Sequence, residues 1–393
     1  MDVRNVDIVF GDKPAEAVRM LDAGGTRESI LEQTGAVIGV AGASICVDEG
    51  EICVLMGLSG SGKSTLLRAI NGLNKVTRGR VLVRDGDGQV DIASCDPATL
   101  RRMRTSRVAM VFQQFALLPW RTVHENVSFG LELRGMPRAE RDAIVSEKLR
   151  MVELDKWKDK FVHELSGGMQ QRVGLARAFA TDADILLMDE PFSALDPLIR
   201  DHLQDELLDL QKSLKKTIVF VSHDLDEALK LGNHIAIMEA GRIVQYGEPE
   251  AIVLNPANEY VAEFVAHMNT INVLRGRSMM TGVEDLPRRD GALILDWSGQ
   301  NRLVLAADGS VESVTVDDKP SPLATYVDDG GGMDALDKGV VVLASPDIRM
   351  RTAIELRHCT GTPVIFVEDG KVVGVIGDDE IYRGILRQSV VED

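Results

Sequence analysis

Continuous apolar runs of four or five residues recur through the N-terminal two thirds of the chain. They are Ile52–Met56, Ile185–Met188 and Ile218–Val221, and polar helical stretches such as Ile199–Leu214 separate them. Strands that are apolar at every residue are typical of a parallel sheet with both faces covered by helices. The pattern therefore predicts an α/β domain built around a parallel sheet.

Helical patterns interrupt these strands at two places. Residues Pro14–Gln33 read as helical, between a short strand-like piece that ends at Phe10 and strand-like segments at Val37–Val40 and Ala43–Val47. Between about Pro97 and Glu164 the pattern is mostly helical. We therefore expect the α/β domain to carry a helical insertion.

The pattern changes from about Arg275 onwards. Short strands are predicted at Gly291–Trp297 and Arg302–Ala306, followed by a flexible loop at Asp328–Gly332. The remaining segments predict strand, helix, strand, strand and helix, at Val340–Leu343, Pro346–His358, Pro363–Glu368, Val372–Ile376 and Asp379–Arg387. This order indicates a second, α+β region, with a boundary near Met268–Met280.

Composition and charge narrow the range of partners. The chain has 393 residues, a formal net charge of −17 and 4% aromatic residues. These values argue against nucleic acid, because phosphate backbones bind to positive faces and single-stranded bases stack on aromatic side chains. The N-terminus lacks a basic region followed by an apolar stretch, and no apolar run is long enough to cross a bilayer. We expect no signal peptide, and action at a membrane only through partner proteins.

The most specific chemical signal is a glycine-rich segment between a strand and a helix. It consists of Gly57, Leu58, Ser59, Gly60, Ser61, Gly62, Lys63, Ser64 and Thr65. Glycines let successive backbone N–H groups turn inward around an anion, and the start of the helix adds its positive dipole end. Lys63 is placed to reach the β- and γ-phosphates, and Ser64 to ligate Mg²⁺. The segment is therefore predicted to be a P-loop that binds a nucleoside triphosphate.

Two carboxylates follow the apolar run Ile185–Met188. Asp189 is suited to holding Mg²⁺ through water, and Glu190 to orienting or deprotonating an attacking water. A single acid after a strand often only caps a turn or a helix. The P-loop upstream favours a catalytic pair instead.

A second candidate anion site lies between the P-loop and these acids. Ser166, Gly167 and Gly168 open a helical stretch that continues through Val173–Ala180, and they offer free backbone N–H groups and one hydroxyl. By itself, Ser166 would be better explained as the cap of its own helix. Its position between the P-loop and the acidic pair indicates phosphate binding.

On these motifs, residues 1–268 resemble the ATP-binding subunit of an ABC transporter, whose Walker A, signature and Walker B motifs they match. The resemblance implies that Gln113, in the Q-loop, contacts Mg²⁺ and senses the membrane partner, and that His223 contacts the γ-phosphate. It implies a D-loop ending at Asp196 and an adenine-stacking role for Phe10. The implied catalytic residues are Lys63, Gln113, Glu190 and His223. The implied Mg²⁺ ligands are Ser64, Gln113 and Asp189.

The family places each signature motif against the P-loop of the opposite subunit. One copy of each motif implies a head-to-tail homodimer that holds two ATP and two Mg²⁺ between its subunits. Met169 stands where the general signature has Gln, and we do not expect this difference to abolish activity.

Two stretches and the C-terminal extension narrow the class of transporter. Arg27–Gly35 and Phe192–Arg200 resemble the ATPase subunits of importers for glycine betaine, proline betaine and choline. The resemblance implies an ATP hydrolase that energises uptake of a quaternary amine osmoprotectant and lies at the cytoplasmic face of the inner membrane. It implies permease subunits as direct partners, with Trp120 as the candidate contact, and a periplasmic binding protein as an indirect partner. Because the substrate contacts those partners, this chain does not distinguish choline from the betaines.

Residues 281–393 resemble a pair of CBS modules, after a linker at 269–280. The second module, at about 338–390, is recognisable, whereas the first is degenerate. Nucleotide-binding CBS sequences usually have Ser or Thr after the last strand and Asp three residues later, where this chain has Gly377 and Glu380. We expect a sensory or dimerising region without a bound nucleotide. In the first domain, the helical subdomain is expected at about 97–178.

Two other functions stay open at this point. A soluble ABC-type ATPase that acts on nucleic acid or ribosomes would use the same motifs, but such proteins typically carry coiled-coil insertions or tandem cassettes, which this sequence lacks. A scaffold that binds ATP without turnover has no need of a base at Glu190.

Overall fold

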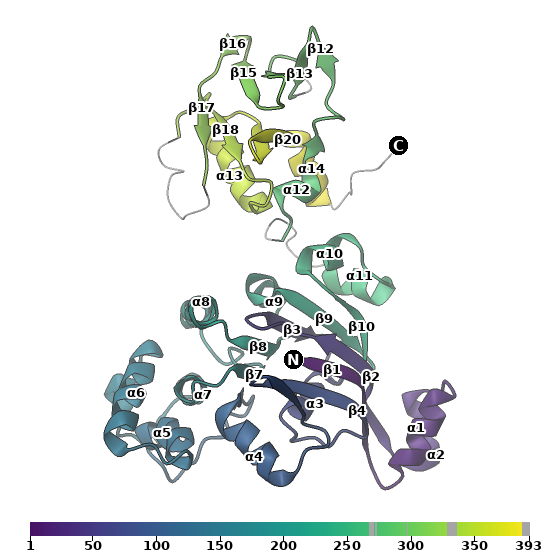
Figure 1. Ribbon diagram of the computed structural model, residues 1–393, viewed down its shortest axis with the longest axis vertical. Helices are drawn as coiled ribbons and strands as arrows, with labels where there is room; N and C mark the ends of the chain where they lie inside the picture. The colour runs from purple at the N-terminus through teal and green to yellow at the C-terminus, as the bar shows by residue number, and fades with distance from the viewer. Residues whose placement is uncertain (267–270, 272, 297, 328–335, 387–393) are drawn as a thin grey trace. The chain divides into compact units, whose positions relative to one another are not determined.

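The computed structural model describes residues 1–266, 271, 273–296, 298–327 and 336–386 (Figure 1). The chain divides into two compact units. The first comprises residues 1–252 and 256–264, and the second comprises residues 253–255 and 265–393. Each unit has its own sheets and its own buried core. Among the described residues, no helix combines the length and the apolar character that a membrane span requires.

A six-stranded sheet of order β10-β9-β3-β8-β7-β6 forms the centre of the first unit. Its strands are β3 (Ile52–Met56), β6 (Val108–Val111), β7 (Ile185–Asp189), β8 (Thr217–Val221), β9 (His234–Glu239) and β10 (Arg242–Gly247). Neighbouring strands pair in parallel, except that the edge strand β10 is antiparallel to β9. Strands β3, β7 and β8 are buried at every residue, which confirms the two-sided burial predicted from their apolar pattern.

A four-stranded antiparallel sheet of order β2-β1-β4-β5 completes the strands of this unit. Its strands are β1 (Asp2–Phe10), β2 (Val37–Cys46), β4 (Arg78–Asp85) and β5 (Gly88–Asp91). Helix α3 (Lys63–Ile70) contacts strands of both sheets, and its apolar residues Leu66 and Leu67 join the shared core. The helix that follows the P-loop is therefore anchored on two sides.

Two groups of helices lie on opposite sides of the first unit (Figure 1). The first is a hairpin of α1 (Pro14–Asp22) and α2 (Arg27–Thr34), inserted between β1 and β2. The second consists of α5 (Val123–Leu133), α6 (Arg138–Met151) and α7 (Gly167–Ala180), which pack on one another. Both groups fall where helices were predicted. The stretch expected to be mostly helical also contains the edge strand β6, because a run of four apolar residues between helices gives a weak strand signal.

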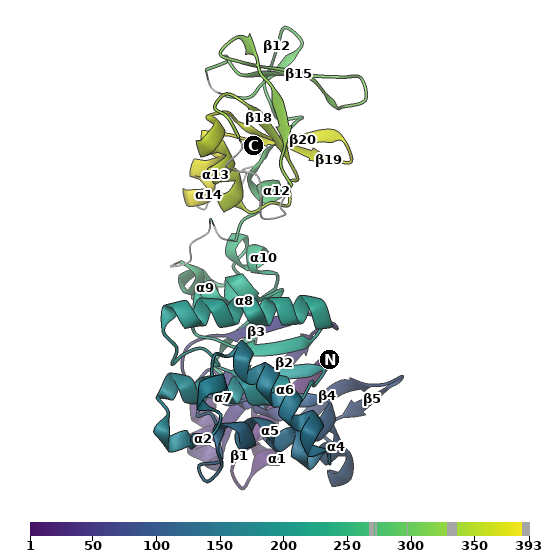
Figure 2. The same cartoon turned by 90° about the vertical axis from the view of Figure 1, so that its left-hand side faces the viewer.

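The remaining helices between residues 97 and 265 are α4 (Pro97–Ser106), α8 (Pro197–Leu214), α9 (Leu225–Leu231), α10 (Pro249–Leu254) and α11 (Glu259–Val265), with 3₁₀ turns at Asp155–Trp157 and Val162–Glu164. Helix α8 is the long helix that extends across the first unit in Figure 2, and Asp196 caps its N-terminus.

The second unit contains a five-stranded sheet of order β11-β20-β19-β18-β17. Its elements are β11 (Thr281–Gly282), β17 (Leu323–Thr325), β18 (Val341–Ala344), β19 (Val364–Glu368), β20 (Lys371–Ile376), α12 (Gly276–Met279), α13 (Met350–Thr360) and α14 (Asp378–Leu386). The order β18, α13, β19, β20, α14 confirms the predicted strand, helix, strand, strand and helix.

A separate antiparallel sheet lies between β11 and β17 in the chain. It consists of β12 (Arg288–Arg289), β13 (Ala292–Ile294), β14 (Arg302–Leu305), β15 (Val311–Val316) and β16 (Lys319–Pro320), in that order. The described residues between 281 and 327 contain no helix, so they do not repeat the strand and helix order found later in the chain. Trp297, the loop predicted at Asp328–Gly332 and Arg387 lie outside the described residues.

Candidate nucleotide site

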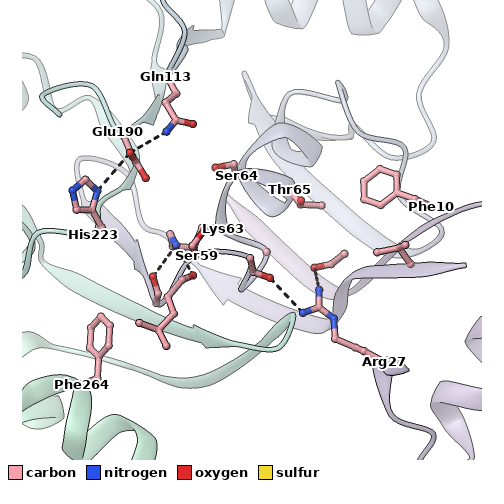
Figure 3. A pocket seen from close by; sticks show the side chains of 16 residues that line it. Phe10, Arg27, Ser59, Lys63, Ser64, Thr65, Gln113, Glu190, His223 and Phe264 are labelled. Atoms are coloured by element: carbon pink, nitrogen blue, oxygen red, sulfur yellow. Dashed lines mark hydrogen bonds and ion pairs between the residues drawn. The ribbon is translucent and has the colours of Figure 1, made fainter. Parts of the chain in front are cut away.

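The predicted P-loop is a tight turn between β3 and α3 (Figure 3). Gly57 and Gly62 have φ angles of 136° and 103°. A Cβ atom at Gly57 would lie 2.1 Å from the carbonyl oxygen of Met238, and one at Gly62 would lie 2.5 Å from that of Gly39. Both positions therefore require glycine, for backbone conformation and for space. The predicted order of strand, loop and helix is confirmed.

Lys63 is the first residue of α3, and its side chain points back into the loop. The ammonium group donates hydrogen bonds to the carbonyl oxygens of Gly57, at 2.7 Å, and Leu58, at 3.0 Å. Burial lowers the pKa of Lys63, while the nearby carboxylates of Glu190 and Asp189 act in the opposite direction. The cation is thus held by neutral carbonyl groups, which phosphate oxygens can replace.

A cavity of about 670 Å³ opens over this loop. Gln113, Glu190 and His223 lie at one end, and Phe10 lies at the other, beyond Lys63 (Figure 3). All the predicted nucleotide-binding residues line the cavity except Ser61, which is buried beneath it. The cavity is therefore elongated, with polar groups suited to phosphate chemistry at one end and an aromatic ring at the other.

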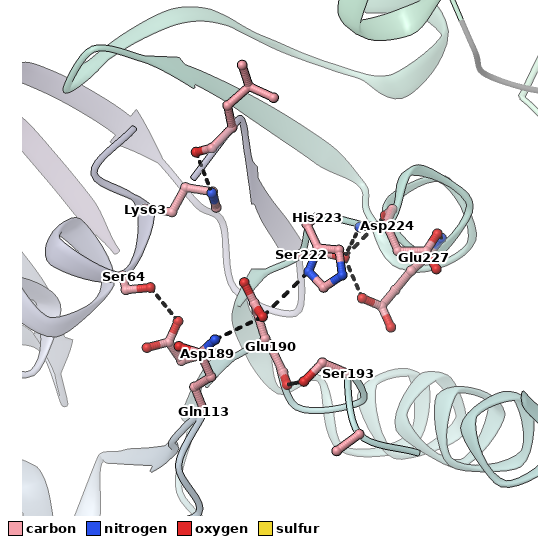
Figure 4. Close-up of polar contacts among 12 residues, drawn as sticks. Lys63, Ser64, Gln113, Asp189, Glu190, Ser193, Ser222, His223, Asp224 and Glu227 are labelled. Atoms are coloured by element: carbon pink, nitrogen blue, oxygen red, sulfur yellow. Dashed lines mark hydrogen bonds and ion pairs between the residues drawn. The ribbon is translucent and has the colours of Figure 1, made fainter. Parts of the chain in front are cut away.

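Asp189 lies under the P-loop at the end of β7, and its side chain is fully buried. The Ser64 hydroxyl donates to one carboxylate oxygen at 2.7 Å (Figure 4). The guanidinium of Arg68 donates to the other at 3.0 Å. A hydroxyl and a carboxylate side by side are the hard oxygen donors that Mg²⁺ prefers. Ser64 and Asp189 therefore fit a magnesium site chemically.

Three strand ends bring Gln113, Glu190 and His223 together. Gln113 follows β6, Glu190 follows β7 and His223 follows β8, so the carboxyl ends of adjacent parallel strands deliver all three. The Gln113 amide nitrogen donates to a Glu190 carboxylate oxygen at 3.1 Å, and His223 Nδ1 lies 3.5 Å from the same oxygen (Figure 4). A carboxylate beside an imidazole and an amide can accept a proton from water and orient the water that it activates.

The backbone at Glu190 has an unusual conformation, and a residue from α7 supports it. Glu190 has a φ of 50°, a region that residues with a Cβ atom rarely adopt. Its N–H donates to the carbonyl of Val221, and its own carbonyl accepts from the Gln171 side chain at 3.1 Å. Gln171 lies two residues after Met169, the last position of the predicted signature motif, but its sequence position did not reveal this contact.

The structure does not bring the predicted signature and D-loop residues into this cavity. Ser166 is the N-cap of α7 and accepts from the Met169 N–H at 3.4 Å, and Asp196 accepts from the Ile199 N–H at 3.1 Å. Neither these two residues nor Gly167 and Gly168 line the cavity of their own chain. Their role against a partner subunit stays a prediction.

Further residues line the cavity that the sequence did not single out as site residues. They are Arg27, Val37, Gly39 and Phe264. Arg27 belongs to the stretch that resembles a class of importers, but only the packing of the inserted hairpin brings its side chain to the P-loop. Val37 and Gly39 enter through β2 and Phe264 through α11, so each depends on long-range contacts that no local motif encodes.

The second unit has its own cavity, of about 320 Å³, beside the end of β20. Its charged lining residues are Asp296, Arg357, Asp378, Asp379 and Glu380. Glu380 already accepts hydrogen bonds from the Thr281 hydroxyl at 2.5 Å, the Gly377 N–H at 2.7 Å and the Arg383 guanidinium at 2.8 Å. The excess of carboxylates disfavours a phosphate group here.

Comparisons with known proteins agree with the site in the first unit. Residues 40–193 match the family model described as ABC transporter. The chain is 41% identical over 403 residues to the glycine betaine/proline betaine transport system ATP-binding protein ProV of Escherichia coli (strain K12), and the match covers 99% of this chain and 98% of that protein. It is 46% identical over 384 residues to the glycine betaine transport ATP-binding protein OpuAA of Bacillus subtilis (strain 168), covering 98% and 89%.

A solved structure is similar in fold to part of this chain. It is described as the dimeric structure of MJ0796, a bacterial ABC transporter cassette. The TM-score is 0.54 at 30% sequence identity, and the match covers 63% of this chain and 99% of that one. A second structure of the same cassette is described as a post-hydrolysis state bound to ADP and Pi.

Proposed function

The chain belongs to the family of ATP-binding proteins of ABC transport systems for glycine betaine, and we propose that it is the ATP-hydrolysing subunit of a quaternary amine importer. The observation that carries the proposal is the meeting of Gln113, Glu190 and His223 at one end of the P-loop cavity. A cassette that only bound nucleotide would not need a carboxylate, an imidazole and an amide at that end.

The shape of the cavity orients the nucleotide. With the adenine on Phe10, the phosphates extend along the P-loop, and the terminal phosphoryl group reaches the end that holds Glu190 and His223. Lys63 exchanges its carbonyl partners for β- and γ-phosphate oxygens. Glu190 accepts the proton of the attacking water, and His223 stabilises the γ-phosphate as its charge is redistributed.

When bound, Mg²⁺ would neutralise the charge that develops on the β- and γ-phosphate oxygens. Ser64 and Asp189 are the residues that would hold it, together with the amide oxygen of Gln113. The Gln113 amide nitrogen donates to Glu190, which leaves the Gln113 amide oxygen available as a ligand. All three supply oxygen, in keeping with the preference of the ion.

A homodimer accounts for the residues that lie outside the cavity. Ser166, Gly167 and Gly168 offer a capped helix start, and Asp196 caps the next long helix. In a head-to-tail dimer these residues would contact the nucleotide held by the partner subunit. The similar solved cassette is described as dimeric. Loss of the γ-phosphate then removes a bridge between two protein surfaces and lets the dimer open.

The membrane partner is expected to bind near the Q-loop. Trp120 is 71% exposed, and aromatic residues are enriched in the cores of protein interfaces. A permease at this surface would place the chain at the cytoplasmic face of the inner membrane, with a periplasmic binding protein on the far side of the permease. The names of the two relatives described above both include glycine betaine, so we favour this substrate over choline.

For the second unit we propose a regulatory role without a bound nucleotide. The carboxylates around its cavity oppose a phosphate group, and the Glu380 side chain is occupied by three donors of its own unit. Both observations are in keeping with the Gly377 and Glu380 substitutions relative to nucleotide-binding CBS sequences.

Reconstitution tests the proposed function. The chain is assembled with its permease and binding protein in liposomes, and ATP hydrolysis is measured with glycine betaine, choline or neither. We expect stimulation by glycine betaine and no turnover for Lys63→Ala. Stimulation by RNA or ribosomes, with no response to any quaternary amine, would show that the chain belongs to the soluble class of ABC ATPases.

A further inference from the structure

The inserted hairpin contacts the P-loop through Arg27, the first residue of α2. Its Nε donates to the carbonyl oxygen of Ile38 at 2.8 Å, and Nη2 donates to that of Gly39 at 3.3 Å. Its Nη1 contacts the carbonyl oxygen of Gly60 at 3.4 Å. Arg27 therefore links strand β2 to the phosphate-binding turn, and its side chain lines the nucleotide cavity (Figure 3).

The hairpin that presents Arg27 is firmly attached to the domain. A small core holds it, formed by Val9, Ala17, Ile30, Ala36, Ile38 and Ala41. Arg78 on β4 donates to both carboxylate oxygens of Asp22, at 2.8 Å each, and to the buried Asp7 at 2.5 Å. Thr26 caps α2 by accepting from the Ser29 N–H. The backbone that carries Arg27 is thus fixed relative to β2.

The charge of Arg27 is not balanced by a direct partner. Within the described parts of the chain, no carboxylate lies within ion-pair distance of its guanidinium. Burial lowers the pKa of Arg27, with Glu28 acting in the opposite direction, yet a guanidinium remains protonated in proteins. A partly buried cation that meets only carbonyl oxygens is better stabilised when an anion arrives beside it.

We propose that Arg27 is a second cation of the nucleotide site, besides Lys63, which positions the P-loop turn at Gly60 and stabilises the phosphates nearest the nucleoside. This proposal rests on the proposed binding of ATP. Arg27 lies towards the end of the cavity that holds Phe10, away from Glu190 (Figure 3). It therefore acts on the part of the nucleotide that ADP shares with ATP, and it takes no part in the hydrolytic step.

The inference is tested by fluorescence titration of the purified full-length chain with labelled ATP and ADP, together with steady-state hydrolysis. Arg27→Gln is expected to raise the Kd of both nucleotides, and the KM for ATP, by about tenfold, the scale of one charge-assisted hydrogen bond. The kcat stays within about twofold of wild type. Arg27→Lys keeps the charge and recovers most of the affinity. Arg19→Gln, on the exposed face of α1, is the matched control and leaves all values unchanged.

Either of two results overturns the proposal. One is a Kd within about twofold of wild type for Arg27→Gln with both nucleotides; the other is a loss confined to ATP or to kcat. Should Arg27→Gln fail to fold, Arg27→Lys decides, because a full tenfold loss in that variant would exclude a role for the charge. Titrations of the wild type and of Lys63→Ala with the same labelled nucleotides test the proposed ATP binding separately. If the wild type binds neither nucleotide, the proposed function itself is wrong.

Discussion

Gln171 donates a hydrogen bond of 3.1 Å to the backbone carbonyl of Glu190, and so links helix α7 to the acid that follows β7. The same side chain accepts from the Ala194 N–H at 3.1 Å, and it is only 1% exposed. Glu190 needs such support because its positive φ costs about 1–3 kcal/mol relative to ordinary backbone. The helix that begins with the signature motif thereby holds the proposed catalytic base in place.

Replacing Gln171 is expected to lower turnover more than nucleotide affinity. Gln171→Leu removes both hydrogen bonds and lets the backbone at Glu190 relax, so the carboxylate moves away from His223. We expect kcat to fall by about tenfold or more while the KM for ATP changes less than twofold. Steady-state kinetics separate the two values. Equal losses in kcat and nucleotide affinity would instead indicate general damage to the packing of α7.

Glu190→Gln tests the base itself. The amide keeps the size of the side chain and can still contact Gln113, but it cannot accept a proton. Hydrolysis is expected to fall by about 10²–10⁴-fold with ATP binding retained. The closed homodimer should then accumulate with ATP, as measured by size-exclusion chromatography. Hydrolysis at the wild-type rate would show that another group takes the proton.

Arg177 on α7 binds the backbone of the loop that follows Gln113. It donates to the carbonyl oxygens of Phe115 at 2.9 Å and Ala116 at 2.7 Å, and these two residues have φ angles of 58° and 45°. Burial lowers the pKa of Arg177 to about 10. Arg177→Leu leaves both carbonyls without this donor and is expected to lower the free energy of unfolding by about 2 kcal/mol.

Chemical denaturation measures the effect of Arg177→Leu. The control is Arg138→Leu on α6, because the Arg138 side chain is 86% exposed and its ion pair with Asp142 is long, at 3.8 Å. The control should change the unfolding free energy by less than about 0.5 kcal/mol. Equal effects of the two substitutions would exclude a special role for the Arg177 contacts.

Glu227 provides a test that depends on pH. Burial raises its pKa, despite hydrogen bonds from Ser222 and Gln204 that act in the opposite direction. A carboxyl group with a raised pKa in the folded state stabilises the fold below its ordinary value of 4.5, and this contribution is lost as the pH rises through the folded-state pKa. Glu227→Gln is therefore expected to raise Tm at pH 7, and to lose this advantage towards pH 4.5.

Thermal unfolding over this pH range compares Glu227→Gln with Asp226→Asn. Asp226 is the exposed neighbour on the same helix, so its substitution should leave the pH dependence unchanged. A lower Tm for Glu227→Gln at pH 7 would mean that the charged form of Glu227 is favoured in the folded protein.

Local patterns were sufficient to predict the P-loop and the two acids at the end of β7. The P-loop follows the apolar run Ile52–Met56 and the acids follow the apolar run Ile185–Met188, so the periodicity and the chemistry identify the same points in the chain. Gln113 and His223 were placed through a resemblance, and the structure brings both to Glu190. The P-loop, the two acids, Gln113 and His223 all lie at or near the end of a strand. A short stretch of sequence is enough to recognise such a position.

Other features depend on contacts between distant segments. The strands β4, β5, β9 and β10 were not predicted, and β5 and β10 lie at sheet edges, where partial exposure weakens the apolar pattern. Arg27 reaches Gly60 only because the hairpin packs on β2, and Gln171 reaches Glu190 only because α7 packs on β6, the strand next to β7. No local periodicity encodes either contact.

The distance between Phe10 and Glu190 along one cavity has a consequence for evolution. If the nucleotide binds as proposed, the ring beside the nucleobase and the carboxylate that serves in hydrolysis lie at opposite ends of the cavity and do not touch. Substitutions near Phe10 would then broaden the range of nucleotides that bind while hydrolysis stays intact. Substitutions near Glu190 would slow hydrolysis without changing which nucleotides bind.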